Sequence, residues 1–119
     1  MTRYAVEVTD AALAAIRAQA MYIAEEARAP ENARRWLERI LDAVMSLEQW
    51  PRRAARAEED GYVKFEVRRL VVGSHLLLFT LDDEQRKVWI IGLRHGHRLP
   101  RAGDLPSDPA AGEVDASED

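Results

Sequence analysis

The sequence predicts an α+β domain with the element order β-α-α-β-β-β, in which a helical hairpin packs on one face of a small, mainly antiparallel sheet. Two observations predict it: apolar residues recur at helical spacing in the first half of the chain, and short apolar runs separated by polar turns fill the second half. The strongest runs are residues 76–79 and 88–91, and the charged turn 82–86 lies between them. Two such runs joined by a short turn predict an antiparallel hairpin, around which the other elements are arranged.

The composition is that of one soluble globular domain. The chain has 119 residues, of which 47% are hydrophobic and 32% charged, and it has no cysteine. Disulfides and thiolate metal sites are therefore excluded. Since no apolar run approaches the roughly 20 residues that span a bilayer, and the first residues have no signal-peptide character, we expect a cytoplasmic protein without membrane contact.

The first predicted element is a short strand that leads into a helix. Tyr4, Val6 and Val8 alternate with less apolar residues, which is typical of a strand with one buried face. Thr9 or Asp10 then offers a side-chain oxygen that can cap a helix N-terminus.

Two amphipathic helices follow and are predicted to pack as an antiparallel hairpin. The first ends before Pro30, because proline disfavours helix at the residue before it but suits a first helical position. The second runs from about residue 31 to 49 and ends at Trp50 and Pro51. The first stripe comprises Leu13, Ile16, Ala20, Ile23 and Ala27, and the second comprises Ala33, Trp36, Leu37, Ile40, Leu41, Val44 and Leu47.

The second half begins with a polar loop and continues as strands. Residues 52–61 are polar and predict the loop. Val63, Phe65 and Val67 alternate with charged residues and predict a half-buried strand, after which residues 73–74 form the turn into the central hairpin.

The charge is divided unevenly along the chain. Residues 103–119 hold six acidic residues and no Lys or Arg, whereas the remainder holds 17 basic and 15 acidic residues, a net charge of +2. This bias is too weak to indicate nucleic-acid binding by itself. We expect a folded domain over residues 1–101 and a disordered acidic tail over residues 102–119, because the tail has almost no large apolar residues.

A basic end follows the second strand of the hairpin and is the candidate functional surface. Arg94, His95, His97 and Arg98 lie close together there, and we expect that a core could not easily hold them. His95 and His97 would point the same way on an extended chain. Without nearby Asp, Glu or Cys, two histidines do not predict a metal site, so we expect no metal and no cofactor. The simpler alternative is that one histidine packs its ring while the other faces water.

Four segments carry a resemblance to a known family: SLEQWP at 46–51, VRRLVVG at 67–73, LLFTLDD at 77–83 and GLRHGHR at 92–98. In this order the chain resembles the RelE/ParE toxin superfamily of type II toxin–antitoxin modules over residues 3 to about 101. The closing segment is most similar to the ParE branch. The resemblance implies a toxin that binds DNA gyrase and traps its cleaved-DNA complex without turnover, and that a cognate antitoxin neutralises in a hetero-oligomer.

The resemblance also implies a target-facing site and two alternatives. The target-facing residues are expected to be Arg68, Arg69, Arg94, His95, His97 and Arg98. RelE-type proteins instead cut mRNA on the ribosome and place an arginine before the apolar run of the third strand, where this chain has Leu76. If the chain is such a nuclease, His95, His97 and Arg98 are its candidate catalytic residues; otherwise we expect no catalytic residue. The second alternative is a degenerate toxin that only binds its antitoxin, with the acidic tail folded back over the basic end.

The sequence also has more apolar strand residues than two helices can cover. In the family the exposed sheet surface is covered by the C-terminal segment of the antitoxin. We therefore expect an exposed antitoxin-binding patch, although self-association would cover the same surface. Its expected residues are Leu76, Leu78, Trp89 and Ile91.

Overall fold

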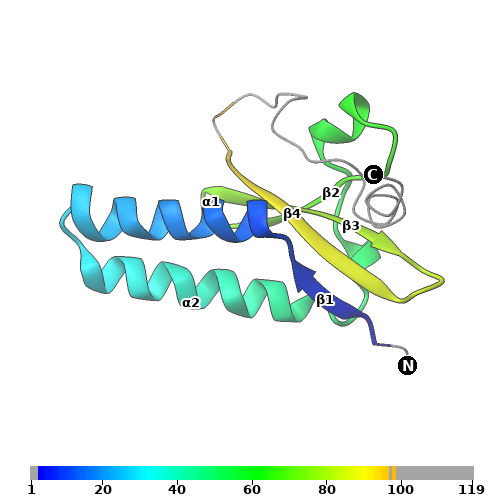
Figure 1. Ribbon diagram of the computed structural model, residues 1–119, viewed down its shortest axis with the longest axis horizontal. Helices are drawn as coiled ribbons and strands as arrows, with labels where there is room; N and C mark the ends of the chain where they lie inside the picture. Colours follow the sequence, from blue (N-terminus) through cyan, green and yellow to red (C-terminus); the bar gives the residue numbers. More distant parts are fainter. Residues whose placement is uncertain (1–2, 97, 99–119) are drawn as a thin grey trace, which may run out of the picture.

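A computed structural model of the chain describes residues 3–96 and 98, and it confirms the predicted fold class. Two helices pack as a hairpin against a four-stranded sheet (Figure 1). The elements are β1 (Ala5–Val8), α1 (Asp10–Met21), α2 (Pro30–Ser46), β2 (Arg68–Val72), β3 (His75–Asp82) and β4 (Lys87–His95). The spatial order of the strands is β1-β4-β3-β2; β1 runs parallel to β4 and the other pairs are antiparallel.

The starts of the two helices follow the predicted signals, whereas α2 ends at Ser46, before the predicted end at residue 49. Thr9 caps α1, because its Oγ1 accepts a hydrogen bond from the Ala12 amide at 3.2 Å. The chain continues beyond α1 as a π-helical turn, η1 (Tyr22–Glu26), and Pro30 then occupies the first turn of α2. The turn between β2 and β3 uses Gly73 at φ 60°, a backbone conformation that glycine adopts without strain.

The first hydrophobic core lies between the helices and one face of the sheet. Ile16 of α1 and Ile40 of α2 pack there against Phe79 of β3 and Ile90 of β4. Three residues of the predicted stripes, Leu13, Ala27 and Leu41, are instead exposed. The core is therefore formed by narrower helix faces than the periodicity alone indicated.

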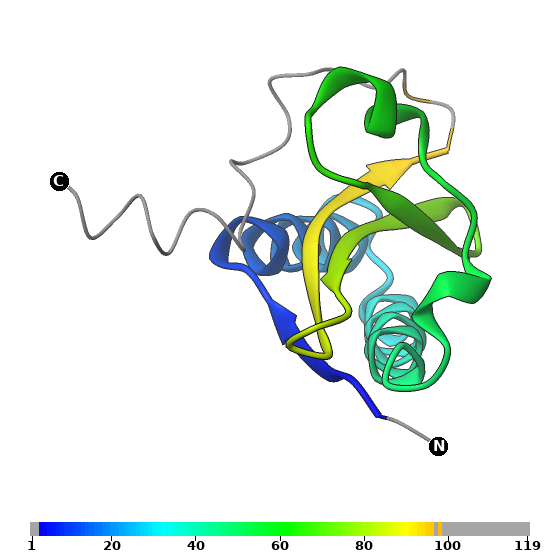
Figure 2. The ribbon, with the colours of Figure 1, turned by 90° about the vertical axis from the view of Figure 1, so that its right-hand side faces the viewer.

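The opposite face of the sheet is covered by the chain itself, which differs from the prediction. Residues 63–67 are not a strand; with the preceding loop they cross the sheet and form a second core through Ala57 and Val67, with Val63 and Phe65 at its margin. In Figure 2 this segment is the green loop with its short helical turn at the top. The alternation in 63–67 does mark one apolar face, but this face packs onto the sheet, and the segment does not pair with the sheet as a further strand.

The expected antitoxin-binding patch is consequently buried, and the expectation of an exposed patch was wrong. The four residues form the centre of the second core, with exposures of Leu76 8%, Leu78 3%, Trp89 2% and Ile91 1%. Backbone hydrogen bonds hold the covering segment in place: the Ala57 amide donates to the Val67 carbonyl, and the Arg69 amide donates to the Ala55 carbonyl, each at 2.9 Å. Within the described residues, no helix is long and apolar enough to cross a membrane.

Candidate functional site

Arg94 is the residue of the predicted basic end whose environment differs most from the expectation. Its side chain is 5% exposed and pairs with Glu59, which is 2% exposed and lies in the helical turn η3 (Glu58–Tyr62). Arg94 Nε donates to Glu59 Oε2 at 2.5 Å, and Nη2 donates to Oε1 at 3.3 Å. A guanidinium can be buried in this way only when a carboxylate neutralises it. The core therefore does hold this charge.

The same arginine also positions the chain beyond β4. Arg94 Nη1 donates to the carbonyl oxygen of Arg98 at 2.6 Å. The guanidinium of Arg94 thus links Glu59, in the segment that covers the second core, to Arg98, which follows β4. Arg94 is in this structure a positioning residue and not an exposed contact.

Arg68 and Arg69 lie away from the other predicted target residues. Arg68 pairs with Glu66, and its Nη1 donates to the Arg52 carbonyl at 3.2 Å. Both arginines are partly buried along β2. Arg68 is paired with Phe79, whereas His95 is paired with His75 at the other end of β3, so four residues, or about 13 Å of strand, separate them. The structure does not bring these two groups into one site.

The residues that the structure does bring together surround a hollow of about 360 Å³ between α1 and the end of β4, called here the His75 hollow. His95 and Arg98, both exposed, line it together with the buried His75. His97 lies outside the described residues. The complete lining is Ala15, Ala18, Gln19, Tyr22, His75, Leu93, His95 and Arg98.

Three aromatic rings contact one another edge to face beside this hollow. The ring of His75 lies edge-on to Trp36, with centroids 5.4 Å apart, and edge-on to His95, with centroids 5.1 Å apart. Burial, together with the charge of His95, lowers the pKa of His75 below its ordinary value. The sequence carries no local signal for this arrangement, because His75 and His95 meet only through cross-strand pairing.

The buried His75 predicts a pH dependence of stability. The pKa of His75 is lower in the folded protein than in the unfolded chain, so the unfolded chain binds the proton first as the pH falls. The contribution of neutral His75 to stability is therefore complete above pH 6.5, the ordinary value, and is lost as the pH falls from 6.5 towards the lower pKa of the folded protein. The slope is at most about 1.4 kcal/mol per pH unit for one proton. Urea denaturation at pH values between about 7.5 and 5, spaced roughly half a unit apart, measures how the free energy of unfolding depends on pH. In His75→Gln this part of the slope should vanish; an unchanged slope would contradict the assignment.

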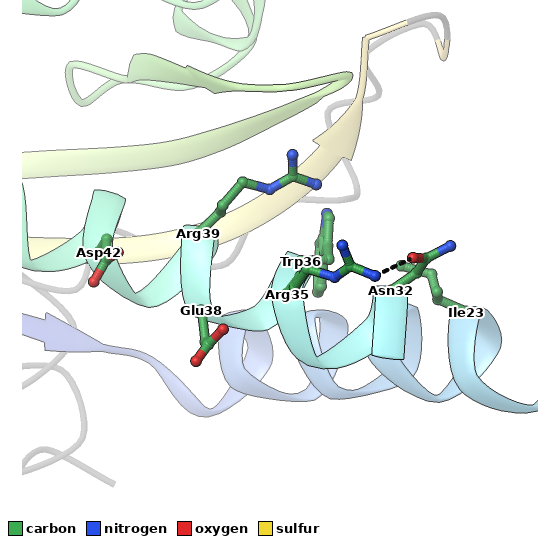
Figure 3. A pocket seen from close by; sticks show the side chains of 7 residues that line it. All are labelled: Ile23, Asn32, Arg35, Trp36, Glu38, Arg39 and Asp42. Carbon is green, nitrogen blue, oxygen red and sulfur yellow. Dashed lines mark hydrogen bonds between the residues drawn. The ribbon is translucent and has the colours of Figure 1, made fainter. Parts of the chain in front are cut away.

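A second and larger hollow, of about 560 Å³, lies on α2 and is called here the Trp36 hollow. Its residues are Ile23, Asn32, Arg35, Trp36, Glu38, Arg39 and Asp42 (Figure 3). Trp36 is 6% exposed, and its Nε1 is buried with no hydrogen-bond acceptor among the described residues. An unsatisfied buried donor costs about 1–3 kcal/mol. No local signal in the sequence marks the buried indole nitrogen.

Neither hollow has the composition of a metal site. Within the described residues, no group of three or more His, Cys, Asp or Glu side chains lies close enough together to hold a metal ion. Glu59, which contacts Arg94 of the basic end, accepts a hydrogen bond from that arginine.

Comparison with known proteins identifies the family. Residues 6–100 match the family described as "ParE toxin of type II toxin-antitoxin system, parDE". A solved structure described as the chromosomal ParDE TA system from P. aeruginosa is similar in fold, with a TM-score of 0.61 and 21% sequence identity over 78% of this chain and 96% of that chain. No match is found among curated proteins. Since the family match spans most of the sequence, the chain belongs to the ParE toxin family of type II toxin–antitoxin systems.

Proposed function

We propose that this chain is a toxin that binds DNA gyrase in the cytoplasm, traps the enzyme with its cleaved DNA without turnover, and is neutralised by a cognate antitoxin. The match of residues 6–100 to the ParE toxin family is the observation that carries this function. The fold supports it, since the similar solved structure is described as a ParDE toxin–antitoxin system.

The surface that we assign to the target is the rim of the His75 hollow. The side chains of Arg94 and Arg68 are only 5% and 14% exposed, whereas His95, Arg98 and Tyr22 are exposed around one depression. Aromatic and arginine side chains at the edge of a pocket are the residue types that contribute most to protein interfaces. Positive charge beside them also suits an enzyme that holds DNA.

The antitoxin needs another surface, because the patch expected from the sequence is buried. The outer edge of β2 fits this role. The Arg69 amide points outward and donates to Ala55, and in an antiparallel strand the next residue with the same orientation is Val71. Within the described residues, the Val71 amide has no such partner, and the side chain of Val71 is 63% exposed. An extended antitoxin segment can add to this edge as a further strand.

A gyrase assay tests the target. We expect the purified protein to block DNA supercoiling and to accumulate cleaved DNA, while ribosome-bound mRNA stays intact and added antitoxin restores supercoiling. Because hot-spot truncations cost about 2 kcal/mol or more, Tyr22→Ala combined with Arg98→Ala should weaken inhibition roughly thirtyfold or more. The matched control is Arg86→Asn, which removes one charge at the other end of β4 and tolerates the positive φ of 52° at that position.

Two results would contradict this function. Cleaved mRNA with normal supercoiling would make the chain a nuclease of the RelE type and would turn attention to His95 and Arg98 as catalytic groups. No effect in either assay, from protein that still binds its antitoxin, would identify a toxin that has lost its activity.

A further inference from the structure

Trp50, which follows α2 and precedes the helical turn η2 (Pro51–Arg53), combines exposure with backbone strain. Its side chain is 67% exposed, so it is part of neither core. Its backbone is left-handed, with φ 47° and ψ 56°, a conformation that glycine adopts freely and that a bulky residue rarely adopts. Because neither core packing nor backbone geometry favours tryptophan at this position, a role for the exposed side chain itself is indicated.

Trp50 forms one wall of a hollow of about 410 Å³, called here the Trp50 hollow. The hollow lies where the end of α2 meets the start of β1 (Figure 1), because the Tyr4 amide donates to the Glu48 carbonyl at 2.9 Å. Tyr4 also contacts Asp83 in the β3–β4 turn, so the hollow is at the opposite end of β4 from the His75 hollow. The complete lining is Tyr4, Trp50, Pro51, Arg52 and Arg53.

The polar groups of this lining are already paired inside the molecule. The Tyr4 hydroxyl donates to Asp83 Oδ1 at 2.6 Å. Arg52 Nη2 donates to Asp83 Oδ2 at 2.6 Å and Nη1 donates to Glu66 Oε2 at 3.2 Å, so two carboxylates compensate the charge of Arg52. Arg53 donates at 2.6 Å to a main-chain carbonyl just after α2, at the helix end where carbonyl groups favour a cation.

These internal bonds select the class of ligand that fits the hollow. A carboxylate or a phosphate would have to displace them in order to reach Arg52 or Arg53. An uncharged apolar side chain, by contrast, gains contact with the indole, the phenol ring and the proline ring without breaking any bond. The Trp50 hollow therefore suits a large apolar side chain of a partner.

The outer edge of β1 supplies hydrogen-bonding groups beside the hollow. The Ala5 amide donates to the Arg86 carbonyl at 2.8 Å, so odd-numbered residues of β1 face β4 and the main-chain groups of Val6 face outward. Within the described residues, the amide and the carbonyl of Val6 have no partner on that side. The outward amide of Tyr4 is taken by Glu48, so the open edge begins at Val6, two residues or about 7 Å of strand from the hollow. Such an edge is a template for another extended chain.

We propose that β1 and the Trp50 hollow together bind an extended peptide segment of a partner protein, which pairs with the β1 edge at Val6 and places one large uncharged side chain, such as leucine, beside Trp50. When a peptide adds to a sheet edge, the main-chain bonds provide affinity and the side-chain pocket provides specificity. The edges formed by β1 and β2 lie on opposite sides of the sheet. This surface is therefore separate from the edge assigned to the antitoxin, and it does not depend on what the toxin inhibits.

The test uses the full-length chain and capped heptapeptides of threonine that carry a different residue at the centre. A peptide with central leucine should shift the fluorescence emission of Trp50 to shorter wavelengths as it covers the indole. Trp36 and Trp89 are only 6% and 2% exposed, so their emission should not respond. With aspartate at the centre, the Kd should rise about tenfold or more, because the charge loses hydration without gaining a partner.

Two measurements test the pairing with β1. The leucine peptide should lose its binding when alternate residues on its β1-facing side are N-methylated, because those amides can no longer donate. Amide hydrogen exchange of the protein should slow at Val6 when the unmethylated peptide binds. Exchange at Ala5 should stay as it was, since that amide already donates to Arg86.

Trp50→Gly separates a binding role from a structural role. Glycine relieves the left-handed backbone, so the urea midpoint should stay unchanged or rise. Calorimetric titration should nevertheless show the affinity for the leucine peptide falling about thirtyfold or more, as for a tryptophan at the centre of an interface. Tyr62→Ala is the matched control, because it removes an aromatic side chain that is 53% exposed and lies outside the hollow.

Three results would overturn the assignment. The first is an emission spectrum that does not change with leucine peptide up to about 1 mM, the limit of weak binding. The second is a lowered urea midpoint for Trp50→Gly with unchanged peptide affinity, which would make Trp50 a structural residue. The third is an emission that changes on dilution of the protein alone while light scattering shows a dimer, which would place a second copy of the chain on this edge.

Discussion

Arg94→Ala should lower the free energy of unfolding by about 3–5 kcal/mol, since it leaves the Glu59 carboxylate buried without a counter-charge. The same variant removes the donor to the Arg98 carbonyl, so the chain after β4 loses its anchor as well. Urea denaturation measures the change, with the midpoint expected to fall while the slope stays constant.

Two controls separate the buried charge from other effects. Arg56→Ala breaks the pairs of Arg56 with Asp60 and Glu66; because the arginine side chain is 60% exposed, the change should cost no more than about 1 kcal/mol. The double change Glu59→Met with Arg94→Met replaces the pair by apolar groups and should recover most of the lost stability. If Arg94→Ala cost as little as Arg56→Ala, the described burial of the pair would be wrong.

Trp89→Ala should also cost about 3–5 kcal/mol, because it removes the largest side chain of the second core and leaves a cavity. Because Trp89 is buried, we expect the variant to bind the antitoxin normally under conditions where it is folded and to lose binding only where it unfolds. Circular dichroism during thermal unfolding gives the stability, and titration with antitoxin at a temperature where the variant is folded gives the affinity.

Val71→Ala is the control for an exposed strand residue, in contrast to the buried Trp89. Its side chain is exposed on the edge of β2, so the change should alter the free energy of unfolding by no more than about 0.5 kcal/mol. If Trp89→Ala left stability unchanged and abolished antitoxin binding, then Trp89 would be a partner contact and the second core would be misassigned.

Much of the fold was predictable because its signals are local. The apolar runs on either side of the turn at 82–86 specify the β3–β4 hairpin, and Thr9 and Pro30 mark the starts of the two helices. Each of these features acts within a few residues, where periodicity and capping chemistry are informative.

The missed features all depend on contacts between distant segments. Glu59 and Arg94 are 35 residues apart in the chain, and nothing beside either residue indicates a partner. Likewise, alternation in 63–67 shows one apolar face but cannot distinguish a paired strand from a segment lying across a sheet. The candidate site at the end of β4 therefore stays a prediction, and no local signal in the sequence shows that Arg94 within it is buried and paired with Glu59.

The parallel pairing of β1 with β4 has a consequence for how the toxin is made. The Thr9 amide donates to the Ile90 carbonyl at 3.0 Å, so the first strand joins the sheet only through the last one. Because β4 is central, a nascent chain emerging from the ribosome cannot complete the sheet until about residue 95 is free. During synthesis the helical hairpin precedes the surface it packs on, and a partially translated chain has neither core. The rim that we propose for target binding, at the end of β4, thus forms last, after the rest of the domain has been synthesised.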